Sequence, residues 1–401
     1  MGRPVLRTRL CDILDIEYPI ILAGMGGVST AELVAAVSEA GGLGIVGAAS
    51  MPPDEIERQV RRIRDLTSKP FGVDVLLPSG VAAPAVRGAE GSAPTDAPDK
   101  NGGDAVAAAQ PSAPKRPRDY LPPQYGEFID NAGREFGLPK RGQDQDWSAG
   151  MRRIGAGDFS KSQVDAILEL KVPVFASGLG NPAPYVEAFH AQGAKVIGLV
   201  GNVKNARRVA DGGTDIIVAQ GTEAGGHTGR IGTMALLPQV IDAVAPTPVC
   251  AAGGIGDGRG IAGALAMGCD GVWVGTAFLV SREASWPDIL KERIIAATEE
   301  DTRVTRLYSG KTMRNINNPL IEYWESQKLD ALPMGMQGIV SGEIMAGARE
   351  ANRMELLMNP AGQISGMLKA MRPAKEIFEE MVRDAARIFA EGLPSRIQAS
   401  S

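Results

Sequence analysis

The stretch PVCAAGGIGDGRGIAGALAMGCDGVWVGTA, residues 248–277, contains two apolar runs separated by a glycine-rich loop and a helical pattern. Residues 248–254 and 271–277 are apolar throughout, which is typical of parallel strands buried on both faces. Residues 258–268 have the apolar spacing of an amphipathic helix. The stretch therefore predicts a strand–helix–strand unit, and the same alternation recurs along most of the chain.

Six further apolar runs predict strands at residues 19–25, 43–49, 71–77, 172–178, 195–200 and 215–221. Amphipathic patterns predict helices at residues 30–42, 54–66, 182–193 and 204–213. Eight strands alternating with helices predict an α/β fold of the (β/α)8 TIM barrel type, although a doubly wound sheet shares this alternation. The strand count favours the barrel, as do the glycine-rich segments directly after strands, where a barrel's active-site loops emerge.

The interval between the third and fourth strands is far longer than the others. Residues 79–118 are rich in Ala, Pro, Gly and Ser, which predicts a disordered or loosely held loop. Residues 124–137 predict a helix that could cover the barrel mouth, and a linker between two domains is the alternative for the whole interval. Beyond residue 282 helical patterns dominate. The predicted organisation is a barrel formed by residues 1–78 and 151–290, an insertion at 79–150 and a C-terminal helical extension at 291–401 packed on the barrel.

Composition excludes several classes of function. The net charge is −5 and no Lys/Arg-rich run is present, which argues against binding to nucleic acid or an anionic membrane. No apolar run approaches the ~20 residues of a membrane-spanning helix, and the first residues lack the apolar core of a signal peptide. The three cysteines show no metal-ligand spacing. We expect a cytoplasmic protein without a metal site; the sequence does not indicate its oligomeric state.

Two glycine-rich loops predict ligand contacts. Gly253, Gly254, Gly275 and Thr276 follow the last two strands, where backbone N–H groups near a helix start would form a phosphate site. A dinucleotide-binding turn is the alternative, but its glycine spacing and terminal acid are missing; a purely structural glycine turn is also open. The loop after the first strand contains Gly24, Met25 and Gly26, against which a flat ring could lie, unless it is only a close strand-to-helix turn.

Two polar residues have unusual positions. Asp74 interrupts the apolar strand FGVDVLL, so it should either bond a ligand at the barrel rim or pair with an internal cation, and we favour the ligand. His227 lies in QGTEAGGHTGR, residues 220–230, as one of two histidines in the chain and among four glycines. Either a ligand approaches the bare backbone there and His227 reaches it, or the segment is a tight turn with an incidental histidine. The other histidine, His190, lies in a predicted helix and should be structural.

Taken together, five stretches resemble the nitronate monooxygenase family, formerly called 2-nitropropane dioxygenases. They are PIILAGMGGVSTAELVAAVSEAGGLGIVG (19–47), KPFGVDVLL (69–77), VAQGTEAGGHTG (218–229), AAGGIGDGRGIAGALAMG (251–268) and VWVGTAF (272–278). The likeness spans residues 10–77 and 164–281, and continues more weakly through SGKTMRN and GQISGM in the tail.

This resemblance implies a TIM barrel that holds non-covalent FMN with its phosphate beside the last two strands. By matching position, Gln220 and Gly225 would contact the flavin. Gly225 and Gly226 would let His227 approach the face of the flavin. Gly254 and the run Trp273, Val274, Gly275 and Thr276 would surround the phosphate end. His227 matches the catalytic histidine. Asp74 departs from the family, which usually has Asn at this position to bond the flavin.

The reaction implied is the oxidation of an alkyl nitronate by O2 to a carbonyl compound and nitrite. His227 would deprotonate a nitroalkane or stabilise the nitronate charge. FMN-dependent enoyl-acyl-carrier reductases and quinone reductases have similar motifs, so reduction of an enoyl thioester or quinone by NAD(P)H is the alternative. A non-catalytic protein that binds a flavin or phosphate ligand is a third possibility.

Overall fold

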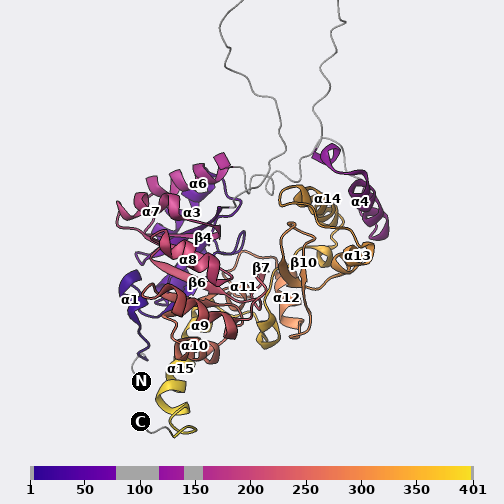
Figure 1. The fold of residues 1–401 in the computed structure, drawn as a ribbon. Coiled ribbons are helices and arrows are strands. Elements are labelled where there is room, and N and C mark those ends of the chain that lie inside the picture. The colour runs from indigo at the N-terminus through magenta and orange to yellow at the C-terminus, as the bar shows by residue number, and fades with distance from the viewer. Residues whose placement is uncertain (1–3, 78–116, 140–156, 399–401) are drawn as a thin grey trace, which may run out of the picture.

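Eight parallel strands form the centre of the molecule (Figure 1). The computed structural model describes residues 4–77, 117–139 and 157–398. The strands are β1 (Ile20–Leu22), β2 (Gly44–Gly47), β3 (Phe71–Leu77), β4 (Val174–Gly180), β5 (Lys195–Val200), β6 (Ile216–Gln220), β8 (Val249–Ala252) and β9 (Gly271–Val274). They follow the order β1-β9-β8-β6-β5-β4-β3-β2. Backbone hydrogen bonds from Leu22 N to Leu43 O (2.8 Å) and from Leu43 N to Ile20 O (3.0 Å) join the two ends. The predicted TIM barrel and all eight predicted strands are confirmed.

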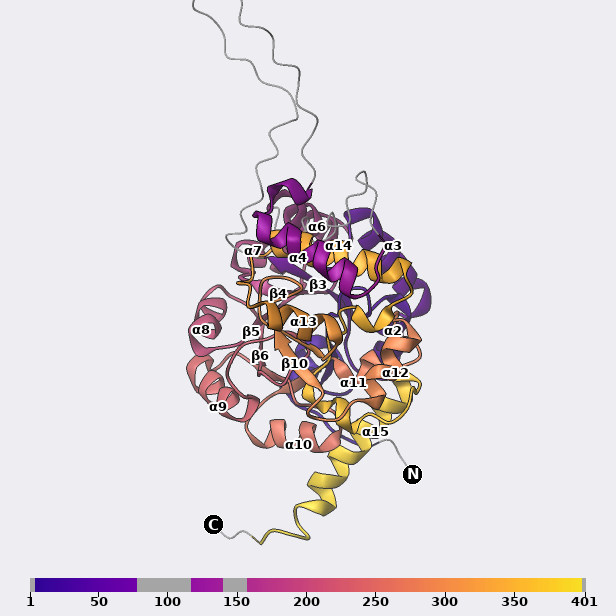
Figure 2. The ribbon, with the colours of Figure 1, turned by 90° about the vertical axis from the view of Figure 1, so that its right-hand side faces the viewer.

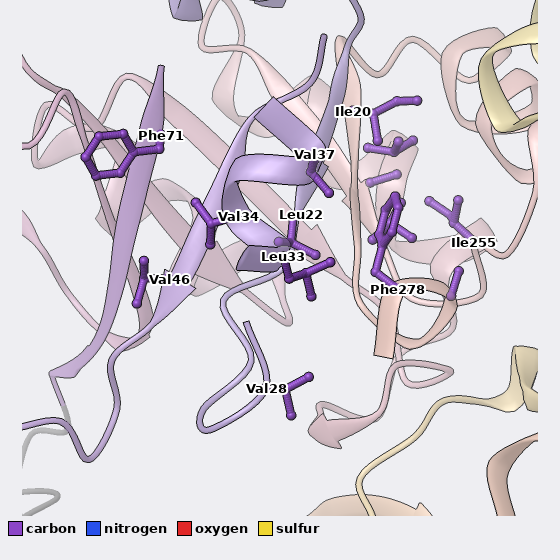
Figure 3. Close-up of a cluster of buried hydrophobic side chains, with 14 of the residues drawn as sticks. Ile20, Leu22, Val28, Leu33, Val34, Val37, Val46, Phe71, Ile255 and Phe278 are labelled. Carbon is purple, nitrogen blue, oxygen red and sulfur yellow. The ribbon is translucent and has the colours of Figure 1, made fainter. Parts of the chain in front are cut away.

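Strand alternation divides the apolar side chains between two cores. Ile21 belongs to the core inside the barrel, whereas its neighbours Ile20 and Leu22 belong to the core between the strands and the helices. Figure 3 shows part of this outer core, which includes Leu22 together with Leu33 and Val34 of a surrounding helix. Burial of each such side chain stabilises the fold by about 1.5–3 kcal/mol. The runs are apolar throughout because both faces of every strand are covered.

Helices surround the strands (Figure 2). They are α2 (Ala31–Glu39), α3 (Pro53–Leu66), α6 (Gly157–Glu169), α7 (Ala183–His190), α8 (Val203–Asp211), α9 (Thr233–Val244) and α10 (Gly258–Ala266). Side-chain caps fix where some of them begin: the Asn202 side chain accepts from Asn205 N, and the Asp257 side chain accepts from Arg259 N. At the amino ends of the strands, α1 (Arg9–Leu14) contributes Leu10 and Leu14 to the inner core.

The last helix of the chain completes this outer layer. β9 is followed only by the short α11 (Thr276–Leu279), and α15 (Ala374–Arg387) packs instead against both α10 and α2. Its Phe378 ring lies 6.0 Å from the ring of Tyr18, near β1, and 6.5 Å from that of Phe278, in α11. A helix far along the sequence therefore closes the outer layer.

The segment between α11 and α15 is not purely helical, contrary to the sequence prediction. It contains α12 (Asp288–Ala296), α13 (Pro319–Gln327), α14 (Met336–Glu350) and short helices at Met354–Leu356 and Gln363–Met367, and a further short helix at Ile388–Gly392 follows α15. It also contains the strands β10 (Thr302–Thr305) and β11 (Met313–Ile316), which form a sheet with β7 (Gly226–His227). The pairing partner lies far away in sequence, so local patterns could not indicate it.

The helix predicted at 124–137 is observed as α4 (Pro123–Glu135). It follows a short helix at Pro117–Tyr120 and packs against α14, away from the barrel strands (Figures 1 and 2). Phe128 and Trp324 lie in a third apolar core, with ring centroids 5.1 Å apart. The loop predicted at 79–118 lies outside the described residues except for its last two positions. In the part of the chain that is described, no helix has the length and apolarity needed to span a membrane.

Candidate active site

A cavity of about 480 Å³ lies at the carboxyl ends of the barrel strands. One wall consists of the loops after the strands, and the opposite wall comes from the segment between α11 and α15. The methionines of that wall are Met313, Met334, Met345 and Met358. The volume is within the range of sites that bind cofactors and small molecules.

The structure brings together every predicted site residue except one. The cavity is lined by Gly24, Met25, Gly26, Asp74, Gln220, Gly225, Gly226, His227, Gly253, Gly254, Trp273, Gly275 and Thr276. Val274 does not line it: the side chain is buried in the outer core, because successive residues of β9 point to opposite faces. Trp273 points into the barrel and Val274 away from it.

Asp74 is buried at the cavity wall, with 6% of its surface exposed. Its carboxyl group accepts a hydrogen bond from the backbone N–H of Gly178, and its Oδ1 has no hydrogen-bond partner among the described residues. Burial raises the pKa of Asp74 to about 8. No cation of the described chain shifts its pKa, so the alternative of an internal ion pair finds no support there, and the side chain lines the cavity.

Glycines let the two walls of the cavity approach each other. A Cβ atom on Gly225 would lie 2.6 Å from the backbone carbon of Ala361 and 2.7 Å from Gly362 N. Gly362 N also donates to Thr276 Oγ1 at 3.0 Å, which ties the tail to the loop after β9. Gly253 has a φ of +90° and Gly254 a φ of +76°, a conformation that other residues rarely adopt.

His227 lies in β7, paired with Met313 of β11. Gln220 Nε2 donates to the backbone oxygen of His227 at 2.7 Å, and His227 Nε2 lies 2.8 Å from Ser309 Oγ. Burial, helped by the nearby Lys311 ammonium, lowers the pKa of His227 to about 4. The imidazole is therefore neutral at physiological pH. Its pKa lies below the near-neutral value that is ordinary for histidine.

Ser309 has a hydrogen-bonding arrangement that can set the tautomer of this ring. Its Oγ accepts from Lys311 N at 3.3 Å, and its hydroxyl proton can point to Lys311 O, 3.5 Å away, or to His227 Nε2, which is nearer at 2.8 Å. When Ser309 donates to His227 Nε2, His227 Nδ1 carries the ring proton and is a hydrogen-bond donor. His190, in contrast, lies outside the cavity and bonds Asp215 Oδ2 at 2.8 Å.

The residues that sequence reasoning missed come mostly from the tail. Ser309 and Met313 lie in SGKTMRN, and Gly362 and Ile364 lie in GQISGM, the two tail stretches in which the family resemblance was weak. That resemblance was the available signal, but it assigned no role to these positions. Glu223 also lines the cavity; its carboxylate accepts from Thr233 N at 3.0 Å, at the start of α9. Within the described ranges no group of His, Cys, Asp and Glu side chains could hold a metal ion.

Comparison with known proteins agrees with this architecture. The family model described as nitronate monooxygenase matches residues 7–99 and 139–384. The protein named "Putative monooxygenase Rv1533" from Mycobacterium tuberculosis is 37% identical over 389 residues, which cover 94% of this chain and 96% of that protein. A "Probable nitronate monooxygenase" of Staphylococcus aureus strain Newman is 32% identical over 393 residues, covering 95% and 98%.

Two solved structures are similar along nearly the whole chain. Nitroalkane oxidase from Streptomyces ansochromogenes has a TM-score of 0.72 and 27% identity, covering 94% of this chain and 98% of that chain. FabK from Thermotoga maritima has a TM-score of 0.71 and 29% identity, covering 98% and 100%.

Proposed function

Because this chain belongs to the nitronate monooxygenase family, we propose that it binds FMN in the cavity and uses O2 to oxidise alkyl nitronates to carbonyl compounds and nitrite. The chain is an oxidoreductase by its family. The observation that carries the finer proposal is the cavity itself, which is lined by glycine-rich loops, a buried carboxyl group with one unpartnered oxygen, a neutral histidine and an apolar wall. The three buried cysteines are unpaired, which supports a reducing, cytoplasmic location.

The residues present fit FMN. Gly253, Gly254, Gly275 and Thr276 offer backbone N–H groups at the ends of β8 and β9, where a phosphate would be held. Met25 and its neighbouring glycines provide a flat surface for the ring system, with Gln220 and Asp74 as polar contacts. When bound, FMN accepts electrons from the substrate and passes them to oxygen.

The protein's own contribution is to hold the substrate anion. A neutral His227 is a poor base at physiological pH, so the substrate would enter as a preformed nitronate and accept a hydrogen bond from the ring. Lys311 is close enough to His227 to lower its pKa, and its positive charge would also attract an anion. The Lys311 charge near His227 therefore supports a nitronate over an uncharged quinone or enoyl thioester.

The alternative is a reductase that takes hydride from NAD(P)H. The structural similarity to FabK favours it. The methionine-lined wall suits either reaction, since flexible thioether side chains adapt to an extended apolar chain as well as to the alkyl part of a nitronate.

The test is to purify the protein with FMN, mix it without oxygen with a nitronate, NADH or NADPH, and follow the flavin absorbance. We expect bleaching by the nitronate, and nitrite formation with oxygen uptake when air is admitted. Fast bleaching by NADH or NADPH, with none by the nitronate, would reject the proposed reaction in favour of the reductase. Protein that takes up no FMN would reject the cofactor assignment.

A further inference from the structure

Among the described residues, no positively charged side chain shifts the pKa of Asp74. The strands on either side of β3 are GIVG (β2) and VFASGLG (β4), and neither contains an ionisable side chain. The loop after β1 is also uncharged, and Gly24 packs so closely that a Cβ atom there would lie 2.4 Å from the Asp74 Cβ.

The charged groups of the other neighbouring elements do not neutralise it. Helices α6 and α2 pack behind β3. Their charged residues, all exposed, are Asp158, Lys161, Asp165, Glu169, Glu32 and Glu39. The other ionisable residues that line the cavity are Glu223, His227 and Arg349. The causes that shift the pKa of Asp74 are burial and the hydrogen bond from Gly178 N–H, and burial dominates.

An ionised Asp74 would therefore be a buried charge with one oxygen unpaired, which is costly. The protonated acid avoids this cost and gains an O–H donor, which then needs an acceptor. Oδ1 finds no such acceptor among the described residues, although the side chain lines the cavity. A molecule that occupies the cavity can supply this acceptor, because the Asp74 side chain lines the cavity.

We propose that Asp74 keeps its proton when FMN is bound and donates a hydrogen bond through it to an acceptor of the flavin ring system. The inference rests on the proposed binding of FMN. Asp74 is then an uncharged donor, as an asparagine amide would be, and the departure from the family's usual residue preserves the hydrogen bond. It adds a property that an amide lacks, because loss of the proton replaces the donor with an anion beside the flavin.

This property predicts a pH dependence of cofactor binding. Below the pKa of about 8 the donor is present and the affinity for FMN is constant with respect to this group. Above it, binding requires a proton to be taken up, so the dissociation constant rises by about tenfold per pH unit. The sign is opposite to that expected if Asp74 bound the flavin as an anion.

The experiment compares wild type with Asp74→Asn, which keeps a donor without a titratable proton, and Asp74→Leu, which has the same shape but no donor. The exposed Asp158→Asn is the matched control. Infrared difference spectra of the apoprotein and the FMN complex near pH 7 detect the C=O stretch of a protonated carboxylic acid directly. FMN titrations between about pH 6 and about pH 9.5 give the affinities.

We expect a protonated-acid band in wild type and Asp158→Asn that is absent from Asp74→Asn. Asp74→Asn should bind FMN within about twofold of wild type near neutral pH and without the alkaline loss, and Asp74→Leu should bind about tenfold more weakly. A wild-type complex without this band, or an Asp74→Leu variant that binds as tightly as wild type, would overturn the inference.

The outcome is distinguishable from that of the proposed reaction, which is scored by nitrite. If FMN binds with the expected pH dependence but no nitrite forms, the reaction is rejected and the role of Asp74 stands. If nitrite forms and the band is missing, the reaction stands and the role of Asp74 is rejected.

Discussion

Replacing Asp74 with Asn should stabilise the protein without cofactor, and the gain should increase with pH. The folded state holds the Asp74 pKa at about 8, against an ordinary value of 3.8. Between these values the folded protein keeps a proton that the unfolded chain has released. The free energy of unfolding of wild type therefore falls by about 1.4 kcal/mol for each pH unit, an effect that disappears below the ordinary pKa.

From about pH 5 to about pH 7 the advantage of Asp74→Asn over wild type should thus grow by about 3 kcal/mol, because all other titrations cancel in the comparison. Urea unfolding of both apoproteins, followed by tryptophan fluorescence, gives the free energies provided that the slopes with urea agree. The exposed Asp158→Asn serves as control and should show no such trend. Parallel pH curves for wild type and Asp74→Asn would show that Asp74 is ionised in the folded protein, and the reasoning would be refuted.

Three further predictions concern Gly225, His227 and Ser309, which also line the cavity. Gly225→Ala should destabilise the protein by about 1–3 kcal/mol, because the new methyl group meets the backbone of Ala361. The control, Gly133→Ala in the open face of α4, should raise the melting temperature slightly. Equal thermal shifts of the two variants would contradict this packing. The His227 ring should titrate with a pKa near 4, so the fall of nitronate kcat/KM that this group causes in acid should lie near pH 4. Proton NMR of the two histidines measures the pKa directly. A His227 midpoint near 6.5 would be inconsistent with burial of the ring. Ser309→Ala should lower kcat/KM for nitronates about tenfold, which is the loss expected for one hydrogen bond. Ser309→Thr keeps the hydroxyl group and should retain most of the activity. A fully active Ser309→Ala enzyme would show that Ser309 has no part in the reaction.

Local sequence patterns were sufficient for the barrel. Each barrel strand is a short apolar run, and it pairs with the strands of the neighbouring strand–helix units. The regular alternation of strands and helices along the chain therefore determines the barrel. The two strands of the tail were missed for the opposite reason. Thr302–Thr305 and Met313–Ile316 are short and mixed in polarity, and β11 is paired with Gly226–His227 from the middle of the chain.

The candidate site shows the same division. The glycine loops and His227 were indicated by residue type and by their place after strands, and Asp74 by its charge within an apolar strand; the structure brings them to one cavity. Val274 was included by matching a continuous motif, although strand alternation turns it outward. Ser309 was missed because its relation to His227 depends on the fold of the tail.

The position of α15 has a consequence for biosynthesis. The groove between α10 and α2, where Tyr18 and Phe278 lie, is covered by Phe378 of α15, which follows all the barrel strands in sequence. A nascent chain whose strands have all left the ribosome still exposes this groove, since the sequence from Arg282 to Pro373 must emerge before Ala374 does. The outer layer is completed only after α15 has emerged, so a premature stop before Ala374 leaves an apolar surface open to chaperones and to aggregation.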